Sequence, residues 1–262
     1  MPTAVCLIRT SVHYRHEAFI KGLAAAGYIV TTKPLRKIDR DDILVIWNRG
    51  SQFQYEARRH DHAHSRIIVA ENGYTDAVDQ DGHQWFSLAI DHHNGCGRWY
   101  QGEAARFPLM GQNLRSWRAE GEFVLVLPQR GIGAPGVAMP ASWPRLIVER
   151  LKKVTRREIR VRPHPGLKSL AKPLAPALAG CHAVVTWGSG AALKSILLGV
   201  PAFYELPGWI AAPAARFGFD TIENPFLGDR MPMFERMAWS QWTVAEISSG
   251  EPFRMFMKVP KK

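Results

Sequence analysis

The stretch TWGSGAALKSILLGVP, residues 186–201, constrains the fold of this chain more than any other segment. The apolar run AVVTW leads directly into Gly188-Ser189-Gly190, and a segment with helical spacing follows. A strand that ends in a tight glycine turn at the start of a helix leaves the first helical amides without intrahelical acceptors. Such a helix start is a favourable place for an anion. The sequence therefore predicts a strand, turn and helix with an anion site at the turn.

The same alternation recurs on both sides of this stretch. Apolar runs that predict strands lie at residues 4–9, 28–32, 42–48, 66–73, 122–129, 158–165, 182–187 and 201–206. Segments that predict helices lie at residues 17–27, between 48 and 66, at 143–155 and at 189–199. Strands that alternate with helices are typical of parallel sheets covered by helices. From Asp76 to Trp117 the pattern breaks down, which predicts long loops.

We therefore expect an α/β protein with two Rossmann-like βαβ domains that face a cleft. The expected boundaries are an N-terminal domain over 1–116, a second domain over 117–232, and a helical segment over 233–262 that packs back on the N-terminal domain. The chain has ordinary globular composition, with 46% hydrophobic residues among 262. It has no apolar run of eighteen residues, no signal-peptide pattern and only three scattered cysteines. These features predict a cytoplasmic protein without stable membrane insertion; they leave the oligomeric state open.

Positive charge is concentrated in the second half of the sequence. The net charge of +11 divides into +2 for residues 1–116 and +9 for residues 117–262. Within residues 144–172, ten basic residues face two acidic ones. This excess favours an anionic partner such as a nucleotide diphosphate, a nucleic acid or a membrane surface. A solvated helix face is the alternative explanation of the same run.

In open α/β sheets, ligands bind outside the carboxyl ends of the strands. Two further strand ends carry anion-binding groups besides the 188–191 turn. In QRGIGAPG, residues 129–136, Arg130 and Gly131 follow a strand; the prolines at 135, 140 and 144 argue against a dinucleotide-binding helix start and favour a loop. In RPHPG, Arg162 and His164 flank a proline that holds the chain extended.

Together, the RPHP strand end and the later VVTWGSGAALKSILLGVPAFYE resemble the donor half of GT-B glycosyltransferases. The similarity covers residues 122–206 and is greatest to the branch of capsule-polysaccharide, sialic-acid and Kdo transferases. It implies a metal-independent hexosyl- or pentosyltransferase that uses a nucleotide-diphosphate sugar as co-substrate and needs no other cofactor. By the resemblance, His164 and the turn Ser189-Gly190-Ala191, with Gly188 before it, would bind the donor phosphates.

This chain departs from that pattern at one position of the helix. Where such enzymes commonly carry a glutamate that meets sugar hydroxyls, the sequence has Lys194, which cannot accept hydrogen bonds. Lys194 could pair with phosphate instead, and Glu205, after the next strand, could serve the ribose. An exposed helix position is the simpler account of Lys194.

The first half would then hold the acceptor and any catalytic base. An inverting transfer needs a carboxylate or a histidine to take the acceptor proton. Candidates at strand ends and in the loop-rich middle are His13, Glu71, Asp91, His92 and His93. Each of them could instead cap a turn. The alternating histidines of HDHAH, residues 60–64, raise a zinc hypothesis, but they lack a full ligand set, so no metal site is expected.

Size and charge bear on the acceptor. A basic transferase of 262 residues resembles the compact virus-encoded enzymes that glycosylate modified bases in DNA. Duplex DNA with a hydroxymethylated base flipped toward the donor is thus the favoured acceptor, as in a bacteriophage enzyme of the host cytoplasm. A cell-surface glycan or lipid-linked acceptor, a noncatalytic nucleic-acid-binding protein and a nucleotide-sugar epimerase remain as alternatives.

Overall fold

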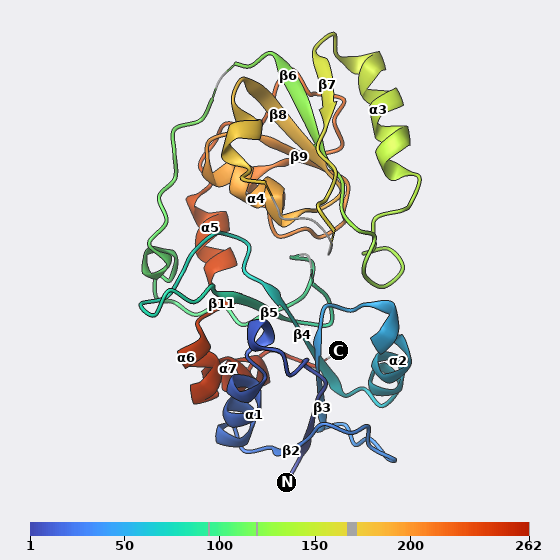
Figure 1. Ribbon diagram of the computed structural model, residues 1–262, viewed down its shortest axis with the longest axis vertical. Helices are drawn as coiled ribbons and strands as arrows, with labels where there is room; N and C mark the ends of the chain where they lie inside the picture. Colours follow the sequence, from blue (N-terminus) through green and yellow to red (C-terminus); the bar gives the residue numbers. More distant parts are fainter. Residues whose placement is uncertain (94, 119, 167–171, 262) are drawn as a thin grey trace. The chain divides into compact units, whose positions relative to one another are not determined.

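A computed structural model describes residues 1–93, 95–118, 120–166 and 172–261. The chain forms two compact units, each built around its own sheet (Figure 1). Unit 1 consists of Met1–His93, Gly97–Gly111 and Arg236–Lys262, and unit 2 consists of Gln112–Glu235 with the short segment 94–96. No helix in the described residues has the length and apolarity needed to cross a bilayer.

Unit 1 contains a six-stranded sheet with the strand order β11-β5-β4-β3-β1-β2. The strands β1 to β4 run parallel, β5 is antiparallel to β4, and β11 is antiparallel to β5. Their bounds are β1 Thr3–Cys6, β2 Ile29–Thr31, β3 Ile43–Trp47, β4 Arg66–Asn72, β5 Phe86–Ile90 and β11 Gln241–Trp242. The edge next to β5 is therefore completed by a strand from the far end of the chain.

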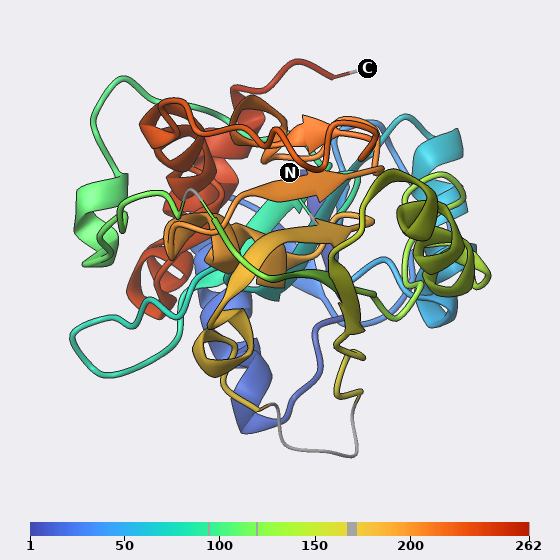
Figure 2. The ribbon, with the colours of Figure 1, turned by 90° about the horizontal axis from the view of Figure 1, so that it is seen from above.

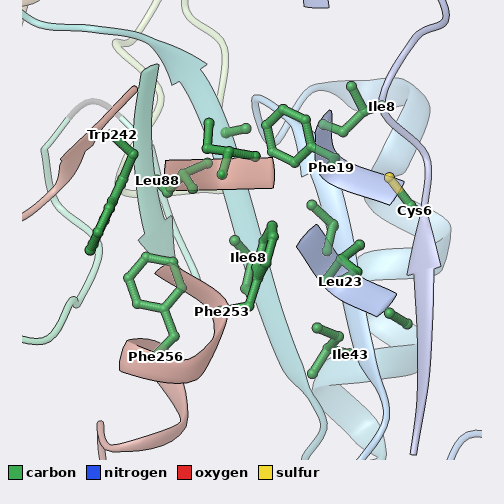
Figure 3. Close-up of a cluster of buried hydrophobic side chains, with 14 of the residues drawn as sticks. Cys6, Ile8, Phe19, Leu23, Ile43, Ile68, Leu88, Trp242, Phe253 and Phe256 are labelled. Carbon is green, nitrogen blue, oxygen red and sulfur yellow. The ribbon is translucent and has the colours of Figure 1, made fainter. Parts of the chain in front are cut away.

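Alternate side chains of this sheet point to two apolar layers. On one face, strand residues such as Ile68 and Leu88 meet Phe19 of α1 (His16–Ala25) and Phe253 of α7 (Glu251–Met257), as Figure 3 shows. Helix α6 (Val244–Ser249) packs against α1 at Gly22, where an added Cβ would lie 1.8 Å from the carbonyl oxygen of Ile247. Helix α2 (Gln54–His62) covers the opposite face. Two helix-covered faces explain why the central strands read as continuous apolar runs.

Unit 2 contains a five-stranded, fully parallel sheet with the order β10-β9-β8-β6-β7. The bounds are β6 Phe123–Leu127, β7 Glu158–Val161, β8 Cys181–Thr186, β9 Ala202–Tyr204 and β10 Arg216–Phe217. Helix α3 (Trp143–Val154) packs its apolar side on one face of the sheet and is seen beside it in Figure 2. The connection from β6 through α3 to β7 runs toward one edge of the sheet, and the connection from β8 through α4 (Gly190–Leu197) to β9 runs toward the other edge. Because such connections are right-handed, α4 covers the face opposite α3.

The remaining elements are short. Helix α5 (Met231–Ala238) ends the segment of unit 2 and enters unit 1. Single 3-10 turns lie at η1 Val12–Tyr14, η2 Ser51–Phe53, η3 Phe107–Met110, η4 Ala175–Leu178 and η5 Ala212–Ala214. The predicted α/β class with two Rossmann-like sheet units is confirmed.

Two local predictions are wrong. The segment 76–117 is not only loops, because Phe86–Ile90 forms β5, a fully buried strand. Its apolar run is short and lies between glycine- and histidine-rich segments, which obscured it. Residues 233–250 are not one helical segment, since β11 separates α5 from α6. A two-residue strand leaves no periodic signal in a sequence.

Candidate functional site

The structure brings four of the predicted donor-side positions to one edge of the unit 2 sheet. All its strands are parallel, so their carboxyl ends lie at the same edge. Arg130 follows β6, His164 follows β7, Ser189 follows β8 and Glu205 follows β9. This is the edge at which open α/β sheets bind ligands.

The 188–191 turn forms a capped helix start. Ser189 is the N-cap of α4, and its Oγ accepts a hydrogen bond of 3.2 Å from the amide of Ala191. Gly190 is the first helical residue, so its amide belongs to the group without intrahelical acceptors. At Gly188 the chain runs so close to Leu206 that an added Cβ would lie 2.5 Å from a side-chain carbon. The two glycines and the serine therefore place backbone amides and a helix dipole at this edge.

Two residues that the sequence analysis missed hold the turn in place. The buried hydroxyl of Thr186 donates to the carbonyl of Leu127 at 2.9 Å and accepts from the amide of Ser189 at 3.0 Å. The side-chain Nε2 of Gln129 donates to the carbonyl of Gly188 at 3.1 Å, while its Oε1 is buried without a hydrogen-bond partner among the described residues. The signal available in the sequence was a polar residue at the end of β8, Thr186, and another just past the end of β6, Gln129.

The loop after β6 and the RPHP segment interact electrostatically. Residues 128–142 contain no α-helix before Trp143, which confirms the predicted loop, and Gly131 adopts a φ of +67°. The pKa of His164 is lowered, first by the protein atoms packed around the imidazole and then by the charge of Arg130. The side chain is nevertheless accessible to solvent. The amide of Gly166 donates to His164 Nδ1 at 3.0 Å. A neutral imidazole that accepts at Nδ1 carries its proton on Nε2, where it can donate to an anion.

Unit 2 itself engages Arg162, Lys194 and Glu205. The Arg162 guanidinium donates to the carbonyl of Lys172. Lys194 is half-buried in α4. The Glu205 carboxylate accepts from Trp143 Nε1 at 2.6 Å and from the Arg150 guanidinium at 2.9 Å. Glu205 thus ties the edge of the sheet to α3.

In unit 1, two of the predicted catalytic candidates lie at the carboxyl ends of the parallel strands. His13, in the turn after β1, makes edge contacts with Tyr14 and Trp47, at ring-centroid distances of 5.0 and 5.8 Å. Glu71 lies near the end of β4 and accepts a hydrogen bond of 2.5 Å from the hydroxyl of Tyr74. This end of the sheet combines an aromatic surface with a carboxylate and an imidazole.

Asp91 and His93 lie elsewhere in unit 1. Because β5 is antiparallel, the amide of Asp91 donates to the carbonyl of Ile67 at the amino end of β4. Asp91 pairs with Arg98, at 3.0 Å, and His93 is buried with its Nδ1 3.4 Å from the amide of Arg49. The neighbouring His92 lines the same region. Glu71 and Asp91 are separated by about four strand residues, roughly 13 Å.

The HDHAH histidines do not gather around a common point. His60 is fully buried, its Nδ1 lies 2.6 Å from the hydroxyl of Ser65, and burial, aided by the charge of Arg59, lowers its pKa to about 4. In the described residues, a cluster of possible metal ligands is formed instead by Asp79, Asp81 and His83, whose ligand atoms lie within 4.8 Å of one another.

The unit 2 edge presents hydrogen-bond donors suited to an anion. It offers a helix start, a guanidinium and a neutral imidazole, all of which donate hydrogen bonds to phosphate oxygens. At unit 1, a carboxylate and an imidazole can accept a proton from a hydroxyl group.

Comparisons with known proteins agree with this architecture. No protein-family model matches the sequence, and no curated protein matches it either. Among solved structures, the chain is similar to KpsC of Thermosulfurimonas dismutans described as a beta Kdo 2,4 transferase, with 12% identity, a TM-score of 0.54 and coverage of 90% of each chain. It is also similar to KpsC of that organism described as a beta Kdo 2,7 transferase, with 11% identity, a TM-score of 0.56, and coverage of 98% of this chain and 99% of that chain. The protein thus has a GT-B-like fold built from two α/β units, one with a mostly parallel sheet and one with a fully parallel sheet.

Proposed function

We propose that the protein is a glycosyltransferase that binds a nucleotide sugar at the carboxyl edge of the unit 2 sheet. The observation that carries this proposal is that Arg130, His164 and the Ser189 turn follow three adjacent strands of one parallel sheet. The similarity in fold to two Kdo transferases supports the same conclusion. A noncatalytic binding protein would have no need for this ordered set of anion-binding groups.

The reaction follows from the groups available. The oxygen of an acceptor hydroxyl attacks the anomeric carbon of the donor, and the bond from that carbon to the phosphate oxygen breaks with its electron pair leaving on the phosphate. The α4 amides, Arg130 and the Nε2 proton of His164 would stabilise the negative charge that develops on the nucleoside phosphate. A basic set of this kind can act without a metal, so transfer is expected to continue in excess chelator.

The acceptor proton requires a base in an inverting transfer. We place Glu71 first among the candidates, because it lies near the carboxyl end of β4 and its carboxylate is held by the Tyr74 hydroxyl. His13 is second, since it is exposed at the end of the same sheet beside Trp47. Asp91 lies toward the amino end of β4, and His93 is buried against the backbone amide of Arg49, so we rank both lower.

We infer that the acceptor is a cell-surface glycan, because both structural neighbours are described as Kdo transferases and neither as acting on DNA. The same neighbours make nucleotide-linked Kdo the first donor to test. Modified duplex DNA is the second candidate acceptor. The exposed basic side chains of α3 and β7, among them Arg145, Lys152, Lys153 and Arg160, favour it by charge alone.

The test is a transfer assay with purified protein. The protein is incubated with a panel of nucleotide sugars and with either capsule-type oligosaccharides or hydroxymethylated duplex DNA, while nucleotide release and acceptor mass are followed. We expect release and mass gain with an oligosaccharide acceptor. Salt-sensitive retention of DNA with no sugar transfer to any acceptor would overturn the proposal in favour of a nucleic-acid-binding protein.

Two variants with matched controls locate the donor site. Ser189→Ala should weaken nucleotide binding, whereas Ser142→Ala should not, because Ser142 is an exposed N-cap of α3 whose side chain makes no capping bond. His164→Ala should weaken binding in the same way, with the exposed His62→Ala as its control. Unchanged nucleotide affinity in both Ser189→Ala and His164→Ala, with an intact fold, would refute the site.

A further inference from the structure

Unit 1 contains a cavity of about 320 Å³ whose lining includes neither Glu71 nor His13, the two bases placed first. It lies between the C-terminal end of α2, the start of β4, the end of β5 and the C-terminal segment of the chain. Its charged lining groups include Arg49, Arg66, Arg98 and Lys261, with Asp61 and Asp91 as the carboxylates. A volume of this size is at the lower end of small-molecule sites.

Positive charge exceeds negative charge on the cavity wall. Arg49 pairs with Asp61, and Arg98 pairs with Asp91. Lys261 pairs with Asp41, which is not part of the lining. Among the ion pairs of the described residues, Arg66 has no carboxylate partner. The charge of Asp91 also acts on Arg66, but Asp91 is already paired with Arg98, so the four basic side chains of the wall face only two carboxylates.

Arg66 is an unusual place for an uncompensated charge, because this residue is only 6% exposed. Its guanidinium donates to the carbonyls of Phe256 and Val259, which satisfy two donors but supply no negative charge. Burial lowers the pKa of Arg66 and the nearby charge of Arg98 adds to this effect, while Tyr28 and Asp91 act in the opposite direction. Buried charges in proteins are normally paired with an opposite charge. A bound anion would supply the missing partner.

Arg49 supplies a second donor group of the same kind. Its side chain is 7% exposed, and its Nη1 donates to the carbonyl of Asp91 at 2.8 Å. Its Nε is buried without a hydrogen-bond partner in the described part of the chain. A buried guanidinium N–H with no acceptor costs free energy, so an oxyanion that reached it would be stabilised.

Anchoring of the C-terminal segment explains part of this arrangement. Arg66 holds the carbonyls of Phe256 and Val259, and Arg98 donates to the carbonyl of Pro260 at 2.8 Å. Neutral donors could hold carbonyls equally well, so anchoring does not account for the open volume or for the excess charge beside it.

We propose that this cavity binds a small oxyanion, namely the phosphate or carboxylate group of a monosaccharide-sized metabolite. The cavity adjoins the amino end of β4, where Asp91 meets Ile67, whereas Glu71 lies at the other end of that strand. Neither Glu71 nor His13, the two bases placed first, is part of the lining, whereas Asp91, ranked lower as a base, is part of it. The cavity belongs to a different unit from the proposed donor site. Binding here does not depend on the proposed transferase activity.

The experiment follows the side-chain Nε–H signals of Arg49 and Arg66 in the full-length ¹⁵N-labelled protein. Three probes are titrated separately: inorganic phosphate, glucose 6-phosphate and glucuronate, each against sodium chloride at matched ionic strength. We expect both signals to shift saturably with at least one probe and not with chloride. The ranking of the three affinities distinguishes a free phosphate, a sugar phosphate and a sugar carboxylate as the preferred ligand.

Variants test whether the cavity residues carry the binding. Arg66→Gln should weaken the best probe by about tenfold or more, the loss expected for one charge-assisted contact. Arg98→Gln is the second variant if Arg66→Gln does not fold, and it should weaken binding similarly. Arg145→Gln, on the exposed side of α3, is the control and should bind like the wild type.

Shifts that do not saturate, or that chloride reproduces, would overturn the proposal. So would unchanged affinity in a folded Arg66→Gln or Arg98→Gln protein. Ser189→Ala is expected to retain this anion binding while it loses nucleotide binding, so failure of the cavity site and failure of the transferase proposal give different results.

Discussion

Replacing Thr186 by valine tests how the anion-binding turn is held in unit 2. Valine fills nearly the same volume, so the substitution removes the hydroxyl without opening a cavity. Two hydrogen bonds are lost, the 2.9 Å bond to the carbonyl of Leu127 and the 3.0 Å bond from the amide of Ser189. Thr186 is fully buried and Ser189 is only 8% exposed, so water cannot readily replace the hydroxyl.

The expected loss follows from these contacts. A lost intramolecular hydrogen bond costs about 1 kcal/mol, and a buried amide left without an acceptor adds about 1 to 3 kcal/mol. Thr186→Val should therefore lower the free energy of unfolding of unit 2 by about 2 to 4 kcal/mol. With a urea slope of about 2 kcal/mol per molar, the unfolding midpoint should fall by about 1 to 2 M.

Hydrogen exchange locates the effect as well as its size. Peptides that cover β8 and the start of α4 should exchange faster in Thr186→Val, whereas peptides from β3 in unit 1 serve as an internal reference. Thr186→Ser keeps both hydrogen bonds and loses only a buried methyl group, so its loss should be about 1 kcal/mol, smaller than that of Thr186→Val. Nucleotide affinity should fall together with the protection of the turn. Equal urea midpoints for wild type and Thr186→Val, with equal exchange at the turn, would refute this account.

Three further predictions concern other parts of the chain. The buried His60 has a pKa of about 4, against 6.5 in the unfolded chain, so neutral His60 contributes fully to stability above pH 6.5. As the pH falls toward 4, the free energy of unfolding should decrease by about 3 kcal/mol, because the unfolded chain binds a proton that the folded protein does not. Urea unfolding between pH 7 and 4.5 should show this decrease, and His60→Gln should make it smaller. Gly22→Ala should lower the melting temperature through a loss of about 2 to 3 kcal/mol, because the new methyl group meets the backbone oxygen of Ile247, whereas Lys21→Ala on the exposed side of α1 should change little. Glu205→Gln should lower the free energy of unfolding by about 1 kcal/mol, because its contacts with Trp143 and Arg150 become weaker. Nucleotide affinity should not change. A several-fold loss of nucleotide affinity at unchanged stability would instead support a ribose contact.

The central parallel strands β1, β3, β4, β6, β8 and β9 were predictable because each is a mostly buried, mostly apolar run. In β3, β4, β6 and β8 nearly every residue is buried, and the polar residues of β4 and β8 lie near the strand ends. The antiparallel pair β5 and β11 was not predictable, because the partner of β5 is a two-residue strand more than 150 residues away. Pairing over that distance depends on tertiary packing, which local sequence patterns do not report.

The candidate site was predictable to a similar degree. The positions after β6, β7 and β8 follow from the rule for parallel strands, and Arg130, His164 and Ser189 were named from it. The supporting bonds of Thr186 and Gln129 were not, since they join strand ends that are 59 residues apart in each case. The position of Asp91 depends on the direction of β5, which the sequence does not reveal.

The C-terminal origin of β11, α6 and α7 has a consequence for biogenesis. Unit 2 is formed almost entirely by one continuous stretch, whereas unit 1 needs residues 236–262 to complete its sheet and to cover Phe19. During synthesis on the ribosome, the first hundred residues therefore cannot complete their fold, and part of their apolar core stays exposed to solvent, until the second unit has been synthesised. A chain stopped after residue 235 should yield a folded latter half joined to a protease-sensitive beginning.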